Sequence, residues 1–133
     1  MTSLFFSWLV IFFVFIVIDA LWLGLAAKSF YQRELGHLML DQPRLQIAAV
    51  FYLIYAVAIL ILAAMPAARD ESSSLAFVLG AMLGFAAYGT YDITNLSTLK
   101  DWPMKMSLVD MAWGTFLTAT SATVGSAAIR YFG

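Results

Sequence analysis

The stretch YDITNLSTLKDWPMKMSLVDMAWG, residues 91–114, joins two long apolar segments and places Asp92 and Asp110 where a membrane protein ordinarily has leucine. Its polar centre is short, which favours an antiparallel hairpin of the two flanking helices. Ionisable groups inside a membrane usually face the interior of the helix bundle and find partners there. The two aspartates therefore raise the question of what they contact.

The composition excludes an ordinary soluble globule. The 133 residues are 63% hydrophobic and 11% charged, whereas soluble domains average about a quarter charged residues. A net charge of -1 leaves no cationic surface for nucleic acid. The absence of cysteine and the single histidine, His37, argue against a metal centre or an attached cofactor, so we expect neither.

Four apolar runs set the predicted architecture. A spanning helix needs roughly 20 mostly apolar residues, and each run meets that length. We therefore predict an all-α fold, a transmembrane four-helix bundle formed as one domain over residues 1–133. The expected helices cover about 4–27, 45–65, 75–99 and 104–130, with a short interfacial helix at about 29–40. Pro66 is expected to close the second helix, because proline interrupts helical hydrogen bonding.

The distribution of lysine and arginine predicts the orientation. Five of these residues lie in the connections after the first and third helices, and two lie on the opposite side. Positive charge favours the cytoplasmic side of a membrane. Both termini are therefore expected on the non-cytoplasmic side, with membrane lipids as the surrounding partners.

The intramembrane acids share one predicted depth. At about 1.5 Å per residue, Asp19 lies about 12 Å, Asp92 about 10 Å and Asp110 about 5 Å from the cytoplasmic ends of their helices. This agreement predicts one polar pocket near the cytoplasmic side. Three close carboxylates cannot all ionise easily, so at least one should hold a proton. The predicted binding residues are Asp19, Trp22, Tyr88, Tyr91, Asp92, Asn95, Asp110 and Trp113.

A short motif occurs at two of these acids. Asp19-Ala-Leu-Trp22 and Asp110-Met-Ala-Trp113 both read D-x-x-W, which places an indole beside a carboxylate on one helix face. The repetition is also consistent with a weak internal duplication. The indole N–H only donates hydrogen bonds, so it suits an acid or a ligand acceptor.

Structural interpretations stand beside these functional ones. Ser107 and Asp110 have the S-x-x-D spacing of a capping box, so Asp110 could satisfy backbone N–H groups at a helix start. Asp92 could be a polar plug between helices, whereas Asp19 has no basic residue within one turn and is harder to explain structurally. His37 is expected to be an interfacial loop residue.

The third and fourth helices carry rows of small residues at every fourth position, including the GxxxG pair Gly80 and Gly84. Such rows let helix backbones approach closely. The rows therefore predict close packing of the last two helices. Transport by so small a chain would need a homodimer, and the GxxxG row offers one surface for it.

Blocks spread along the chain resemble one protein family. The most specific is Tyr88-Gly-Thr-Tyr91-Asp92-x-Thr-Asn95-Leu; others are Asp19-x-x-Trp22-Leu-Gly, Phe30-Tyr31, Leu35-Gly-His37-Leu, Phe51-Tyr52-x-x-Tyr55, Trp102-Pro103 and Asp110-x-Ala-Trp113-Gly-Thr. Together they resemble the DUF2177 family of small bacterial membrane proteins. The resemblance implies a four-helix protein of the bacterial inner membrane and supplies no activity, substrate or catalytic residue.

Three functions remain open from the sequence. The leading hypothesis is a protein that binds a small molecule, a lipid or a proton in the pocket of aspartates, with proton-coupled transport as one version. The second is an intramembrane enzyme that modifies a lipid, with a carboxylate as general acid or base and tyrosine assisting. The third is a structural or assembly subunit, in which the polar groups only join the helices.

Overall fold

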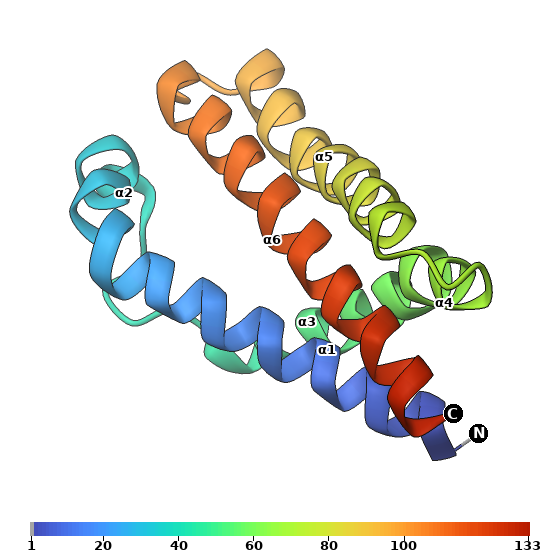
Figure 1. Ribbon diagram of the computed structural model, residues 1–133. Helices are drawn as coiled ribbons and strands as arrows, with labels where there is room; N and C mark the ends of the chain where they lie inside the picture. The colour runs from blue at the N-terminus through green and yellow to red at the C-terminus, as the bar shows by residue number, and fades with distance from the viewer. Residues whose placement is uncertain (1) are drawn as a thin grey trace.

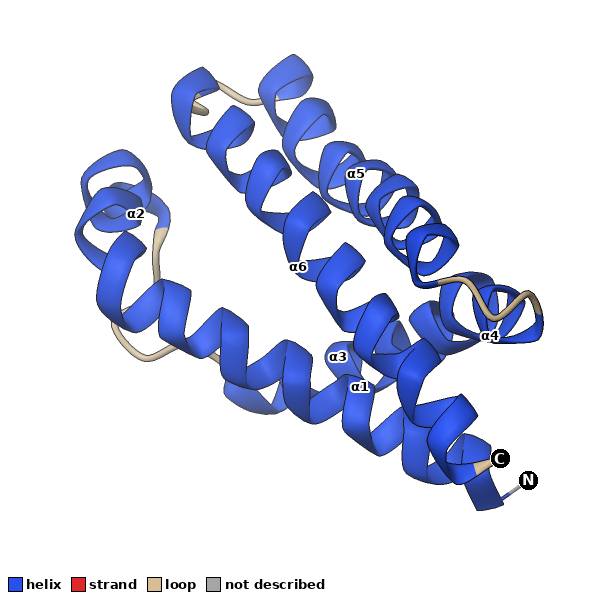
Figure 2. Ribbon diagram, in the orientation of Figure 1, coloured by secondary structure: helices blue, strands red, loops and turns tan. Residues whose placement is uncertain are grey.

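The fold was obtained as a computed structural model, in which residues 2–133 are described. These residues form helices joined by short connections, with no β-strand among them (Figures 1 and 2). The predicted all-α class is therefore confirmed.

The first helical stretch is longer than the sequence predicts. α1 (Thr2–Leu21) continues without a break into a π-helix, η1 (Trp22–Ala27), then into α2 (Lys28–Leu35) and a 3-10 turn, η2 (Gly36–Leu38). The interfacial helix predicted at about 29–40 is thus an extension of the first helix. A π-helix accommodates an extra residue within a helix, so the chain changes direction without a loop.

The second stretch also passes the point where it was expected to stop. α3 (Leu45–Ile59), the π-helix η3 (Leu60–Ala64) and α4 (Met65–Arg69) follow one another directly, so the helix runs through Pro66. Proline lacks an N–H and its ring crowds the carbonyl four residues earlier. The wider hydrogen-bonding pattern of η3 ends two residues before Pro66 and accommodates this defect.

α5 (Ser73–Thr98) and α6 (Met104–Phe132) form the predicted hairpin and pack along each other. Ser72 caps α5, and its side chain accepts a hydrogen bond from the Leu75 amide at 3.0 Å. A Cβ added to Gly84 would lie 2.5 Å from the Gly114 carbonyl oxygen, and one added to Gly80 would meet α6 in the same way. The GxxxG row is therefore filled within the chain and is not free to form the predicted homodimer surface.

α6 does not fit the expectation that all four apolar runs are long and apolar enough to span a membrane. Within residues 2–133, three helical stretches are long and apolar enough to cross a membrane, namely Thr2–Leu38, Leu45–Arg69 and Ser73–Thr98. α6 is long enough but carries many serine, threonine and glycine residues. Leu117, Thr118, Ser121 and Ala122 are fully buried, so this helix faces other helices and needs less apolar surface.

The two ends of the bundle differ in shape. α1 and α6 lie close together near the termini, where the rings of Phe6 and Phe132 are 5.7 Å apart. Figure 1 shows these two helices diverging toward the end that carries α2 and the α5–α6 connection. α5 packs mainly against α6, η3 and α4, whereas α3 packs mainly against α1 and η3. The diverging end holds the candidate site.

Candidate functional site

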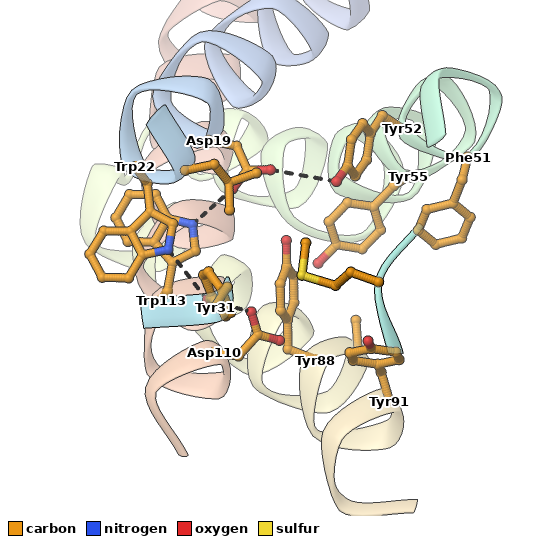
Figure 3. Close-up of a pocket in the computed structure, with 13 residues that line it drawn as sticks. Asp19, Trp22, Tyr31, Phe51, Tyr52, Tyr55, Tyr88, Tyr91, Asp110 and Trp113 are labelled. Carbon is orange, nitrogen blue, oxygen red and sulfur yellow. Dashed lines mark hydrogen bonds between the residues drawn. The ribbon is translucent and has the colours of Figure 1, made fainter. Parts of the chain in front are cut away.

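A cavity of about 500 Å³ lies at the diverging end of the bundle. Its walls come from α1, η1, α2, the α2–α3 connection, α3, α5 and α6, so segments far apart in the sequence contribute to one space (Figure 3). The lining residues are Asp19, Trp22, Leu23, Tyr31, Met39, Phe51, Tyr52, Tyr55, Ala87, Tyr88, Tyr91, Asp110 and Trp113.

Asp19 reaches the cavity because it ends the inward row of α1. Ser7, Ile11 and Phe15 precede it at intervals of four and are buried, and Asp19 itself is 9% exposed. Trp113 donates its indole N–H to Asp19 Oδ1 at 3.0 Å. Tyr52 donates to Oδ2 at a longer 3.5 Å. Two neutral donors from two other helices thus hold this carboxylate.

Asp110 enters the cavity from the first third of α6. The Tyr31 hydroxyl donates to Asp110 Oδ1 at 2.9 Å, and Trp22 donates its indole N–H to the Tyr31 oxygen at 3.4 Å (Figure 3). α6 begins at Met104, and the Ser107 hydroxyl donates to the Pro103 carbonyl at 2.8 Å. Asp110 therefore lies inside the helix, and its interpretation as a helix cap is wrong.

The two D-x-x-W motifs pair crosswise. Asp19 contacts Trp113 of the other motif, and Trp22 is joined to Asp110 through Tyr31. The two indole rings stack, with centroids 4.4 Å apart and an interplanar angle of 11°. α1 and α6 run antiparallel, so the acid of each motif lies level with the tryptophan of the other. The sequence predicted the indole beside the acid of its own motif, and the pairing is instead between helices.

Asp92 and Asn95 do not line the cavity, although the sequence predicts both as pocket residues. Asp92 is fully buried and continues the row of Gly80 and Gly84, which faces α6. Its carboxyl and that of Asp110 are near neighbours. Neither Asp92 oxygen meets hydrogen-bond geometry with any of the described residues. Tyr88, between Gly84 and Asp92 in the same row, does line the cavity, so the row separates the two residues only in their exposure to it.

Several lining residues escaped the sequence analysis. Tyr31 falls in the predicted interfacial helix, and Tyr52 and Tyr55 belong to the predicted second helix but not to the predicted pocket. Tyr52 lies seven residues after Leu45, about 10 Å into the helix at 1.5 Å per residue, which is the depth at which the acids lie. The same depth comparison, applied to tyrosine as well as to aspartate, would have found it.

The chemistry of the cavity is aromatic and acidic. Eight of its lining residues carry aromatic rings, two are carboxylates, and none is lysine, arginine or histidine. His37 is exposed on η2. Within residues 2–133, no cluster of three or more histidine or acidic side chains has the arrangement of a metal site. The cavity therefore offers hydrogen-bond acceptors and ring faces to a bound molecule.

A hydrophobic helical chain with three stretches long and apolar enough to span a membrane is typical of an integral membrane protein. The sequence model described as "Predicted membrane protein (DUF2177)" matches residues 4–127. The chain belongs to this family. Comparison with curated proteins and with solved structures gave no match.

Proposed function

We propose that the protein binds a small molecule within the membrane, in the cavity between α1, α3, α5 and α6. The observation that supports this best is the pair of carboxylates, Asp19 and Asp110, that face one space of about 500 Å³. Small-molecule sites are typically concave, mostly apolar and of about 300–1,000 Å³, with a few convergent polar groups. Acids within a membrane are unfavourable and usually mark a functional site.

The hydrogen bonds around the acids support preorganisation rather than helix joining alone. Trp113 and Tyr31 each give one donor to an acid, and these donors come from separate helical stretches. Fixed donors hold the carboxylates in place before a molecule arrives, which lowers the entropic loss on binding. This arrangement fits the hypothesis of a binding protein, including a small transporter.

We also propose that the protein lies in a bacterial inner membrane with its cavity toward the cytoplasm. α2 and the α5–α6 connection lie at the cavity end, and both termini lie at the other end (Figure 1). Lys28, Arg33, Arg44, Lys100 and Lys105 belong to the cavity end. The positive-inside rule then assigns that end to the cytoplasmic side. Fusing a reporter that is active on one side only to Gly133 tests this orientation.

The cavity is tested by filling it. Ala87 lines it, and the adjacent Ala86 lies on the exposed face of the same helix. We expect a small molecule or lipid to co-purify with the wild-type protein in mild detergent and to be lost from Ala87→Phe. Mass spectrometry of the extracted protein measures this loss.

Ala86→Phe is the matched control, because it adds the same ring to the exposed face of α5. It should retain the molecule at the wild-type level. Equal retention by both variants, or no enriched molecule with the wild-type protein, would contradict binding in this cavity.

A further inference from the structure

Within residues 2–133, the two carboxylates of the cavity have no cationic partner. Every hydrogen bond that reaches them comes from a neutral indole or hydroxyl group, among the residues that the structure describes. No lysine, arginine or histidine lines the cavity. Ionisable groups inside membranes usually pair with one another or with backbone groups. None of the described residues supplies a positive charge to the cavity, and a cationic bound molecule would supply it.

The rings around the acids have the chemistry that recognises such a charge. Five of the chain's six tyrosines and two of its four tryptophans line the cavity, together with Phe51. The faces of aromatic rings attract organic cations, and cages of such rings bind quaternary ammonium groups. Figure 3 shows the aromatic side chains grouped around one space that Asp19 and Asp110 also face.

The rim of the cavity is apolar and exposed. Leu23, Met39, Phe51 and Tyr91 line it and are between 44% and 57% exposed. They come from four separate segments, namely η1, the α2–α3 connection, α3 and α5. In a bilayer this rim lies beside lipid or headgroups, where an apolar group is readily accommodated.

We propose that the cavity takes an organic ammonium ion with an apolar body, whose charged head lies between Asp19 and Asp110. The apolar body lies along Phe51, Tyr91 and Met39 at the rim. This assignment rests on the proposed binding function and names the class of molecule bound. The aromatic rings supply cation–π attraction, and the acids supply the counter-charge.

Three probes test the charge and the body separately, by isothermal titration calorimetry on the purified full-length protein in a non-ionic detergent. Choline and 3,3-dimethylbutan-1-ol have the same shape, and only choline carries a positive charge. Benzyltrimethylammonium adds an apolar ring to the same head. We expect benzyltrimethylammonium to bind most tightly, and choline to bind about tenfold more tightly than the alcohol.

Asp19→Asn should remove most of the preference for choline over the alcohol, because it removes one charge and keeps the shape. Asp101→Asn is the matched control, since Asp101 is an exposed acid in the α5–α6 connection; it should keep the full preference. Asp110→Asn provides a second variant if Asp19→Asn does not fold, and circular dichroism reports the fold of each.

Equal affinity for choline and the neutral alcohol, or an unchanged preference in both aspartate variants, would overturn the assignment to a cation. Absence of binding by all three probes would overturn it as well. These outcomes are separate from the cavity-filling test. A neutral molecule retained by the wild-type protein and lost from Ala87→Phe would leave the binding function in place.

Discussion

Two regions of the helix bundle are built from side chains of different size. In the middle of α5 and α6, the two helices meet through Gly80, Gly84, Ala119 and Ala122, and their backbones approach within contact distance. Near α2, the facing positions carry tryptophan and tyrosine, such as the stacked pair Trp22 and Trp113. Small residues draw helices together by van der Waals contact. Bulky rings hold them apart and leave a cavity between them.

This difference separates stability from binding within one short chain. Close packing of small residues contributes stability without any hydrophobic driving force between helices in lipid. At the aromatic region the helices are in less close contact, and a cavity lies between them that contains the hydrogen-bond acceptors Asp19 and Asp110. Substitutions in the two regions should therefore change the free energy of unfolding to different extents. Four substitutions can test this comparison.

The largest effect is expected from Gly84→Ala. A Cβ at this position would lie 2.5 Å from the Gly114 carbonyl oxygen and 2.8 Å from Thr118 Cβ, so α5 and α6 must separate. Overpacking of this kind typically lowers the free energy of unfolding by about 1–3 kcal/mol, and we expect the upper value. Unfolding in mixed detergent measures it.

Gly24 and Gly36, near the cavity end of the bundle, supply the control for Gly84→Ala. A Cβ at Gly24 or Gly36 meets nothing within 4 Å. Alanine at either position should change the free energy of unfolding by no more than about 0.5 kcal/mol. Equal losses at all three glycines would refute the contrast between the tightly packed α5–α6 contact and the end of the bundle that holds the cavity.

The next effect concerns the two tryptophans that donate across helices. Trp113→Phe removes the donor to the Asp19 carboxylate, and Trp8→Phe removes a donor to the Leu53 carbonyl at 3.0 Å. Hydrogen bonds to charged groups contribute about 1.5–3 kcal/mol and neutral ones about 1 kcal/mol. Trp113→Phe should therefore destabilise the protein by about 2 kcal/mol, roughly twice the loss from Trp8→Phe. The same unfolding assay compares them, and a larger loss from Trp8→Phe would argue against an ionised Asp19.

Asp92→Leu should move stability in the opposite direction. Asp92 is fully buried and its two oxygens lack hydrogen-bond partners among the described residues. Replacing an unsatisfied buried polar group with an apolar one of similar size is neutral or stabilising, here by about 1 kcal/mol. Asp19→Leu is the comparison, because it leaves Trp113 and Tyr52 without their acceptor and should destabilise. Thermal unfolding in detergent gives both values, and a strong loss from Asp92→Leu would reveal a partner for this acid.

The smallest effect is expected from Tyr52→Phe. The Tyr52 hydroxyl lies 3.5 Å from Asp19 Oδ2, which is beyond the usual length of a strong hydrogen bond. Its removal should cost about 0.5 kcal/mol or less. Tyr31→Phe, which loses a 2.9 Å bond to Asp110, should cost more. Equal losses in the unfolding assay would show that Tyr52 holds Asp19 more closely than this distance indicates.

Sequence reasoning reached the helical class, the family and most of the polar residues of the cavity. Length and hydropathy limit a chain in a membrane to helices or barrels, so the fold class followed from the apolar runs. Asp19, Asp110, Trp22, Trp113, Tyr88 and Tyr91 all line the cavity as predicted. Depth along each helix can be counted from the sequence, which is why Asp19 and Asp110 could be placed at one level, although Asp92, predicted beside them, does not line the cavity.

The direction that each side chain faces could not be counted in the same way. Asp92 has the predicted depth but is fully buried and does not line the cavity, whereas Tyr88, four residues earlier on the same face of α5, does. The crosswise pairing of the two D-x-x-W motifs depends on where the antiparallel helices α1 and α6 lie along each other. That offset is set by tertiary packing, which short-range spacing within one helix does not encode.

The π-helix η1 has a consequence for how this chain can change during evolution. Each residue of an α-helix advances the side chain by about 100° around the axis, so Trp22 and Tyr31, nine positions apart, would project to opposite sides. The wider turns of η1 advance less per residue, and this shortfall in phase brings the phenol of Tyr31 to the indole of Trp22. Deleting one residue from this segment would turn η1 into regular α-helix and keep Tyr31 on the same side, whereas loss of the π-helical turns without a deletion would swing Tyr31 away from Asp110.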